Sequence, residues 1–234
     1  MKKIIGLIGY KGFVGSAIAS ELKKKKKKFI GITRNNYNKY CNLKFDYIIN
    51  CSNPSKRFWA KKNPKLDFEE TVNKTKFFLR NYKFNKIIHV SSISARCQIK
   101  TTYGLNKKKA EKLVSKEKNF LIVRLGPMFH KNIDKGVIVD LINSSTVFVN
   151  KYSKYSFTNL KWIAKWIIKN MKKYNGVIEI GSKDYLVLKV LANKINSKSK
   201  FKGIIDNQII KSKLNYNCKS TEVLKFLKNY DRKK

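Results

Sequence analysis

The sequence predicts an α/β fold, with a Rossmann-type doubly wound parallel sheet and a small C-terminal cap. Short apolar runs rich in β-branched residues alternate with helical stretches over the first half of the chain. We expect strands at residues 3–8, 29–33, 46–51, 86–91 and 120–125, and crossover helices at 15–23, 68–80 and 103–115. Nearly continuous apolar strands are typical of a parallel sheet that helices cover on both faces.

The second half of the chain predicts a looser arrangement. Gly126-Pro127 interrupts the alternation. Beyond it we expect one more strand at residues 176–181 and helices at 160–172, 186–195 and 220–229. Trp162 and Trp166 lie one turn apart on the first of these helices, and we interpret them as packing residues.

The composition predicts a folded domain with an unusual charge. Of the 234 residues 42% are hydrophobic, which is enough for a core, and the formal net charge is +40. Such a charge could favour nucleic acid or an anionic membrane surface. Only six of the 54 basic residues are arginine, however, and lysine is spread over the whole chain. We therefore interpret the charge as a compositional bias at solvated positions and expect no specific nucleic acid; charge-driven binding is the alternative.

The cysteines, histidines and apolar stretches indicate whether the protein binds a metal and where in the cell it is located. The four cysteines form no C-x-x-C pair and there are two histidines, so no metal site is predicted. Reduced thiols fit a cytoplasmic protein. The N-terminal lysines and apolar run are similar to a secretory signal, but Lys11 and three glycines interrupt the run, which favours strand, turn and helix. No stretch approaches the ~18 apolar residues of a membrane span.

A glycine-rich loop follows the first predicted strand. Gly9, Gly12 and Gly15 form a Gly-x-x-Gly-x-x-Gly pattern between that strand and the first helix. In this pattern the first glycine allows a tight turn, the second lets the backbone approach a pyrophosphate, and the third lets the helix pack on the strand. The free amides at the start of the helix stabilise the anion. The loop therefore predicts a dinucleotide site; a tight turn without a ligand is the alternative.

The end of the second predicted strand bears on the choice of cofactor. An acidic residue there would accept hydrogen bonds from the adenosine ribose and disfavour a 2′-phosphate. This chain has Thr33-Arg34-Asn35 instead. With Arg34 and Lys11 both available to meet a phosphate, NADP(H) is favoured over NAD(H).

A Ser/Tyr/Lys set predicts a proton-transfer site. Tyr103 and Lys107 are four residues apart, so they share one face of a helix, and Ser92 ends the preceding strand. A nearby ammonium and a positive nicotinamide ring would stabilise the tyrosine phenolate, and Ser92 would hydrogen-bond the substrate oxygen. Lysine is common here, so the pair alone is weak, but its place after Ser91-Ser92 favours catalysis. His89 is interpreted as a core residue.

Together these motifs resemble the extended short-chain dehydrogenases/reductases, the NAD(P)-dependent epimerase/dehydratase family that acts largely on nucleotide sugars. Asp46 to Ser52 is similar to the family's fourth strand, whose end, here Cys51 and Ser52, lies against the cofactor. Residues 124–129 and 176–181 resemble later strands of the family. The loop is locally similar to that of GDP-fucose synthases, in which a basic residue at the position of Lys11 accompanies NADP(H). The resemblance implies cofactor contacts from Gly9, Lys11, Gly12, Phe13, Val14, Gly15, Arg34, Cys51, Ser52, Tyr103 and Lys107.

The resemblance also implies a division of the chain and a class of reaction. Residues 1–126 and 155–181 would form the NAD(P)-binding domain, and 127–154 and 182–234 a small substrate-binding cap. The expected activity is hydride transfer on a nucleotide sugar, a small-molecule substrate, with catalytic residues Ser92, Tyr103 and Lys107 and with a homodimer as one option. Thr71 and Lys74-Thr75 depart from the family's Asn and Gly-Thr, and the interval from Ser92 to Tyr103 is short. Epimerase, dehydratase and reductase activities stay open, and a redox-inactive NAD(P)-binding regulator is the alternative.

Overall fold

The computed structural model describes residues 3–212, 214 and 218–231. The chain divides into two compact units. Unit 1 comprises Met1–Arg124 and Ala164–Ile178, and unit 2 comprises Leu125–Ile163 and Glu179–Lys234. No helix among the described residues is both long and apolar enough to cross a bilayer.

The centre of the fold is a six-stranded sheet with the order β2-β1-β3-β4-β5-β9. The first three strands along the chain are β1 (Ile5–Ile8), β2 (Phe29–Ile32) and β3 (Lys44–Asn50); the others are β4 (Lys83–Ser92), β5 (Phe120–Leu125) and β9 (Gly176–Ile180). β1 pairs in parallel with both β2 and β3, and β3 pairs in parallel with β4. Strand β1 thus lies where the strand order reverses. This arrangement confirms the predicted doubly wound α/β sheet.

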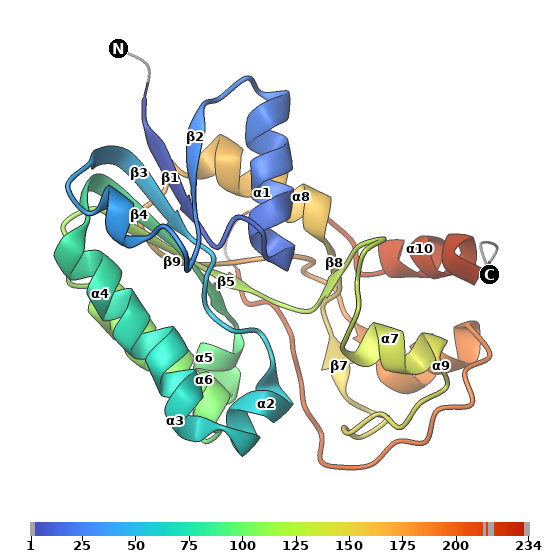
Figure 1. Ribbon diagram of the computed structural model, residues 1–234. Helices are drawn as coiled ribbons and strands as arrows, with labels where there is room; N and C mark the ends of the chain where they lie inside the picture. The colour runs from blue at the N-terminus through green and yellow to red at the C-terminus, as the bar shows by residue number, and fades with distance from the viewer. Residues whose placement is uncertain (1–2, 213, 215–217, 232–234) are drawn as a thin grey trace. The chain divides into compact units, whose positions relative to one another are not determined.

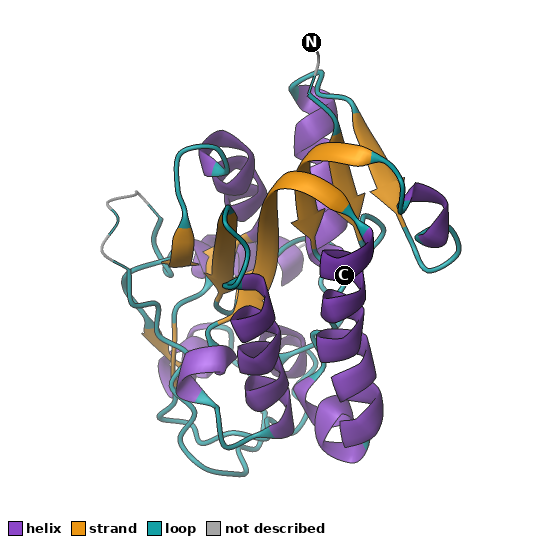
Figure 2. Cartoon of the chain, turned by 90° about the vertical axis from the view of Figure 1, so that its left-hand side faces the viewer, coloured by secondary structure: helices purple, strands orange, loops and turns teal. Residues whose placement is uncertain are grey.

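Helices cover the sheet on both faces (Figure 1). Helix α1 (Phe13–Lys24) lies on one side, while α4 (Lys74–Asn81) and α6 (Thr102–Val114) lie on the other. Figure 2 looks onto the second side and shows helices in front of the strands. Helix α1 buries Ile18, Ala19 and Leu22 against the sheet and ends in lysines, which complement the negative end of the helix dipole.

Each unit has its own apolar core. In unit 1 the core fills the space between the sheet and its helices, with Phe45, Ile48 and Ile87 fully buried, and it includes Ile8, Ile32, Phe78, Tyr82, Val114 and Ile122. In unit 2 the core is built from Phe129, Ile138, Leu141, Val147, Tyr155, Phe157, Leu188, Leu191, Ala192, Val223 and Leu227. Burial of these side chains supplies the main stabilisation of each unit.

Unit 2 contains short strands and helices. Strand β6 (Met128–Phe129) pairs with β8 (Thr158–Asn159), and β7 (Lys154–Tyr155) pairs with β10 (Leu186–Val187). Its helices are α7 (Val137–Ile142), α9 (Leu188–Lys194) and α10 (Glu222–Asp231). Helix α8 (Leu160–Asn170) begins in unit 2 and ends in unit 1. The substrate-binding role expected for residues 127–154 and 182–234 stays a prediction.

Several elements differ from the sequence prediction. The helix expected at residues 68–80 begins earlier, as α3 (Pro64–Phe68), because proline suits the first turn of a helix. It then passes through a π-helical turn, η2 (Glu69–Asn73), before α4. The helix expected at 186–195 starts as strand β10. Three short helices were not predicted: α2 (Arg57–Lys62), α5 (Ser94–Cys97) and α7. A short 3-10 turn, η1 (Asn38–Tyr40), follows β2.

The unit 1 core gives a direct test of this packing. Phe45 is completely buried, so Phe45→Ala should lower the free energy of unfolding by about 3–5 kcal/mol. Phe58 is 68% exposed, and Phe58→Ala should change it by less than about 0.5 kcal/mol. Urea unfolding followed by circular dichroism measures both values. Equal losses in the two variants would contradict the packing described here.

Candidate functional site

The predicted site residues gather at one edge of the sheet. Because β1, β3 and β4 are parallel, their carboxyl ends lie on the same edge. Gly9 follows β1, Cys51 and Ser52 follow β3, and Ser92 is the last residue of β4. In open α/β sheets ligands bind at this edge, where the strand order reverses. The structure therefore brings both the glycine loop and the serine of the predicted catalytic set to the expected place.

The glycine loop is shaped by close backbone approaches. Gly9 has a φ of 75°, and a Cβ at this position would lie 2.8 Å from the Cα of Ser52. A Cβ at Gly15 would collide with the carbonyl oxygen of Gly9. A side chain at either position would thus force β1, β3 and α1 apart.

The start of α1 fits an anionic ligand. Gly12 is the N-cap residue of α1 and provides no side-chain cap, and the first turn, which includes Phe13 and Val14, has no acidic residue. A Cβ at Gly12 would meet only the carbonyl oxygen of Gly9, at 3.2 Å. The amide groups of the first turn and the positive end of the helix dipole are what a pyrophosphate requires. The loop therefore fits a dinucleotide.

Two basic side chains predicted to meet a phosphate lie near this loop. Lys11 is exposed, and its Nζ lies 6.0 Å from the centroid of the Tyr10 ring. Arg34 follows β2 and forms an ion pair of 2.8 Å with Glu70. The Arg34 side chain is 76% exposed, so this ion pair is worth at most about 1 kcal/mol and Arg34 can exchange Glu70 for a ligand phosphate. Asn36, which the sequence did not single out, holds the turn by accepting a hydrogen bond of 2.7 Å from the Thr33 amide.

The three predicted catalytic residues lie together. The Ser92 side chain lies close enough to the Tyr103 hydroxyl to lower the pKa of that group. The Nζ of Lys107 lies 5.0 Å from the centroid of the Tyr103 ring and donates a hydrogen bond of 2.7 Å to the carbonyl oxygen of Pro54. Helix α6 starts at a well-formed cap, because the Thr101 hydroxyl accepts a hydrogen bond from the Gly104 amide. This cap fixes the turn that carries Tyr103.

Burial dominates the electrostatics of Tyr103 and Lys107. Tyr103 is 7% exposed, and burial raises its pKa, whereas the hydrogen bond with Ser92 and the charge of Arg57 act to lower it and Asp67 to raise it. Burial also lowers the pKa of Lys107 to about 7, against the opposing effects of Asp67 and Glu111. The protein alone thus disfavours both charged forms, and the expected stabilisation of the phenolate by a positive nicotinamide ring stays a prediction.

A buried ion pair anchors α6 to the sheet. Arg124 on β5 donates two hydrogen bonds from its guanidinium group to Glu111 on α6, from Nε to Oε1 at 2.8 Å and from Nη2 to Oε2 at 2.6 Å. The hydroxyl of Ser91 on β4 donates a third, of 2.7 Å, to Oε1 of Glu111. Glu111 lies two turns beyond Tyr103 and one beyond Lys107. The interaction therefore sets the position of the helix face that carries both residues.

A second polar chain connects β3 to β4. The backbone amide and hydroxyl of Ser52 both donate to Oδ1 of Asn50, so the Asn50 amide donates to Nδ1 of His89. Burial lowers the pKa of His89 to about 3, and the neutral ring must then carry its proton on Nε2. Nε2 lies 3.2 Å from the side-chain amide of Asn53, whose oxygen otherwise lacks a partner; turning this amide over satisfies both groups.

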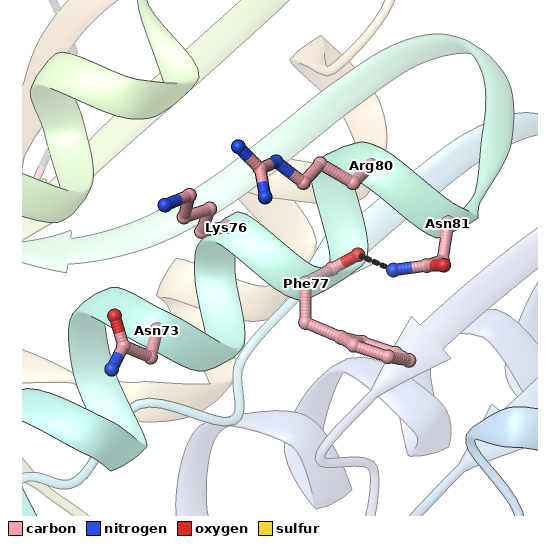
Figure 3. Close-up of a pocket in the computed structure, with 5 residues that line it drawn as sticks. All are labelled: Asn73, Lys76, Phe77, Arg80 and Asn81. Carbon is pink, nitrogen blue, oxygen red and sulfur yellow. Dashed lines mark hydrogen bonds between the residues drawn. The ribbon is translucent and has the colours of Figure 1, made fainter.

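A shallow pocket elsewhere in unit 1 contains none of the predicted residues. It lies along η2 and α4 and is lined by Asn73, Lys76, Phe77, Arg80 and Asn81 (Figure 3). The side-chain amide of Asn81 donates to the carbonyl oxygen of Phe77. The lining is basic and amide-bearing, without a residue that could exchange a proton at neutral pH. We assign no catalytic role to this pocket.

The structure adds residues that the sequence analysis did not select. Arg57 and Asp67 act electrostatically on Tyr103, and Pro54 and Glu111 interact with Lys107. The sequence gives only a weak signal for these residues. They come after β3 in the chain or lie on α6, and only folding brings them close to Tyr103 and Lys107. Glu111 alone has a local signal, since an acidic residue four positions after Lys107 shares its helix face. Among the residues described, no cluster of histidine, cysteine and acidic side chains could hold a metal ion.

The anchor of α6 can be tested by mutation. Arg124→Met removes the short ion pair of the buried Glu111 carboxylate, which keeps the Lys108 ammonium at 4.0 Å, and should lower the free energy of unfolding by about 3–5 kcal/mol. Arg34→Met, which removes the exposed ion pair with Glu70, is the matched control and should cost less than about 1 kcal/mol. Chemical unfolding measures both. A small loss for Arg124→Met would show that the pair does not hold the helix in place.

Solved structures of known proteins share this fold, whereas the sequence comparisons find no match. No protein-family model and no curated protein sequence matches the chain. A UDP-N-acetylglucosamine 4-epimerase from Methanobrevibacter ruminantium M1, solved with UDP-N-acetylmuramic acid, is 16% identical, with a TM-score of 0.76 over 99% of this chain and 98% of its own. A dTDP-4-dehydrorhamnose reductase from Bacillus anthracis, solved with NADP, is 15% identical, with a TM-score of 0.78 over 100% of both chains.

A third structure extends the same likeness. A UDP-glucose 4-epimerase from Thermotoga maritima, solved with UDP-glucose, is 15% identical, with a TM-score of 0.75 over 98% of this chain and 99% of its own. These are enzymes of the kinds that the predicted family contains. Identities this low establish the architecture, and function must be argued from the site. The chain therefore has the fold of the extended short-chain dehydrogenases/reductases, the family that its motifs resemble.

Proposed function

We propose that the protein is an NAD(P)-dependent enzyme that acts on a nucleotide sugar, as an epimerase, dehydratase or reductase. The observation that carries the proposal is the grouping of Ser92, Tyr103 and Lys107, in which Ser92 acts on the Tyr103 hydroxyl and the Lys107 ammonium lies 5.0 Å from the Tyr103 ring centroid. This set belongs to the unit whose glycine loop fits a dinucleotide. A buried tyrosine with a serine partner and a neighbouring ammonium can exchange a proton with a substrate oxygen.

Each of the three side chains has a separate task. Ser92 would donate a hydrogen bond to the substrate oxygen and keep it beside the hydroxyl of Tyr103. Tyr103 would give or take the proton on that oxygen. The positive charges of Lys107 and Arg57 favour the phenolate form that this exchange requires. A bound nicotinamide would supply or accept the hydride at the neighbouring carbon.

The proposed cofactor is NADP(H), with NAD(H) as the alternative. Three features support this preference. No carboxylate occurs in Thr33-Arg34-Asn35, Arg34 is exposed and bound only weakly to Glu70, and Lys11 is exposed on the glycine loop. The Bacillus anthracis reductase of the same fold was solved with NADP. Gly9, Gly12, Gly15, Phe13 and Val14 would hold the pyrophosphate through backbone contacts, while Cys51 and Ser52 would border the cofactor at the end of β3.

The nucleotide-sugar substrate is supported by the neighbours and by the motifs. Two of the three structures above were solved with UDP-sugars, UDP-glucose and UDP-N-acetylmuramic acid. The short interval between Ser92 and Tyr103 is occupied by the small helix α5 instead of a long loop. A homodimer and a cytoplasmic location stay predictions.

Cofactor binding is the first test of this function. Calorimetric titration at moderate salt should show saturable one-to-one binding of NADPH, and weaker binding of NADH. Gly12→Asp should abolish both, because a carboxylate at the N-cap residue of α1 repels a pyrophosphate at the helix start. Excess tRNA should leave NADPH binding unchanged. Absence of NADPH binding together with tight, salt-sensitive tRNA binding would favour a charge-driven nucleic-acid function instead.

Turnover is the second test. On a panel of UDP-, dTDP- and GDP-sugars, with product analysis by chromatography, Tyr103→Phe should lower turnover by about 10²–10⁴-fold while NADPH still binds. Tyr40→Phe, which removes the hydroxyl of a tyrosine outside this set, is the control and should keep the wild-type rate. Full turnover by Tyr103→Phe would overturn the assigned roles. Binding of NADPH without turnover of any sugar would favour the redox-inactive regulator.

A further inference from the structure

Asp67 is a buried carboxylate that the catalytic set does not use. It lies on α3, has no exposed surface, and receives a hydrogen bond of 2.8 Å from the side-chain amide of Asn106 to Oδ2. Its other oxygen, Oδ1, has no hydrogen-bond partner among the described residues. Burial raises the pKa of this carboxyl group, so its ionised form needs a compensating positive charge nearby.

Lys107 is a buried cation that lacks a negatively charged hydrogen-bond partner among the described residues. It directly follows Asn106 on α6 and is 3% exposed, and the one hydrogen bond described for its ammonium goes to the carbonyl oxygen of Pro54. A carbonyl group is neutral and does not balance the buried charge. Lys107 therefore also needs a counter-ion if it is to stay charged in this position.

The other titratable groups around Lys107 already interact with another residue or are neutral. Glu111 on α6 gives both of its oxygens to Arg124 on β5. His89 on β4 is held neutral by burial and by Lys107 itself. Arg57 on α2 acts on Tyr103, and Tyr103 is neutral unless it loses its proton. Asp67 is the charge acting on Lys107 that lacks a cation of its own.

We infer that Asp67 is the counter-ion of Lys107, a positioning residue that keeps the catalytic lysine protonated, and that Asn106 holds it in place. Asp67 and Asn106 act on the chemistry only through the charge of Lys107. This inference deepens the proposed function and rests on it for its catalytic meaning, but the coupling between the two charges exists in the protein without cofactor.

The coupling has a pH dependence with a definite sign. The pKa of Lys107 is about 7 in the folded protein, against about 10.4 in an unfolded chain. The unfolded state therefore binds more protons between about pH 7 and 10, so the contribution of Lys107 to stability increases as the pH rises through this range. Removing the negative charge of Asp67 lowers the folded pKa of Lys107 further, and the rise then begins at a pH below about 7.

The experiment is a double-mutant cycle on the protein without cofactor. The free energy of unfolding is measured from about pH 6 to 9 for wild type, Asp67→Asn, Lys107→Met and the double variant. Asparagine has the shape of aspartate and can still accept the Asn106 hydrogen bond, so Asp67→Asn changes mainly the charge. When Lys107 is present, we expect Asp67→Asn to lower the pH at which the free energy of unfolding begins to rise. In the Lys107→Met protein we expect no such shift.

Two controls separate charge coupling from a structural role. Glu69→Gln removes an exposed carboxylate two residues away and should leave the onset unchanged. If Asp67→Asn fails to fold, Asn106→Ala keeps the charge but removes its hydrogen bond, and should produce a smaller shift in the same direction. An equal pH dependence of the Asp67→Asn effect with and without Lys107 would overturn the inference.

The second readout is cofactor affinity. The NADPH dissociation constant is measured from about pH 6.5 to 9, and Asp67→Asn should move the midpoint of affinity loss to lower pH. At a pH above the midpoints of both proteins, a midpoint that lies one pH unit lower means about tenfold weaker binding. A uniform loss at every pH would indicate a structural role and contradict the inference. If wild type binds no NADPH, the proposed function fails, whereas the unfolding cycle still decides whether Asp67 and Lys107 are coupled.

Discussion

The buried pair of Glu111 and Arg124 is the interaction on which the arrangement of the site depends. It joins α6 to β5 through two charge-assisted hydrogen bonds, and Ser91 extends it to β4. Two of the proposed catalytic residues are sequence neighbours of this pair: Ser92 follows Ser91, and Lys107 precedes Glu111 by one turn. A bidentate pair permits little rotation of the helix about its axis. The same contact that satisfies a buried carboxylate thus sets the register between Tyr103 on the helix and Ser92 on the strand.

A second constraint is that the site is built from buried groups whose charges must be balanced nearby. Glu111 is balanced by Arg124, and His89 is neutral between two asparagine amides. Lys107 and Asp67 are the two remaining buried charges of this region, and their protonation states are therefore linked. In such a site, replacing one charged side chain changes the protonation state of its neighbours more than it changes the packing. A residue on α3 would act on the proposed chemistry of α6 in this way.

The parts of the fold that were predictable are those with local causes. Strands such as Phe29–Ile32 follow from short apolar runs. The glycine loop follows from the positive φ that glycine permits at position 9 and from the close backbone approach that it permits at position 15. Helices α2 and α5 were not predictable, because six and four residues form a helix only when tertiary contacts support them. Asp67 was missed for the same reason. In a lysine-rich helix an aspartate indicates a solvated ion pair, and its burial depends on Asn106, which is 39 residues away in the sequence.

Burial also resolves the ambiguity that the lysine content creates. A lysine four residues after a tyrosine is nearly inevitable in a chain with 54 basic residues, so the motif alone has little weight. Of the lysines whose surroundings are described, however, two are buried, Lys86 and Lys107. Lys86 reaches the carbonyl oxygen of Tyr174, and burial lowers its pKa as well, but it lies near the start of β4, away from the carboxyl edge. Compositional bias adds lysine where solvent accepts the charge at little cost. It does not place an ammonium in the interior beside a tyrosine, where desolvation opposes it, and this cost is the physical argument for function at Lys107.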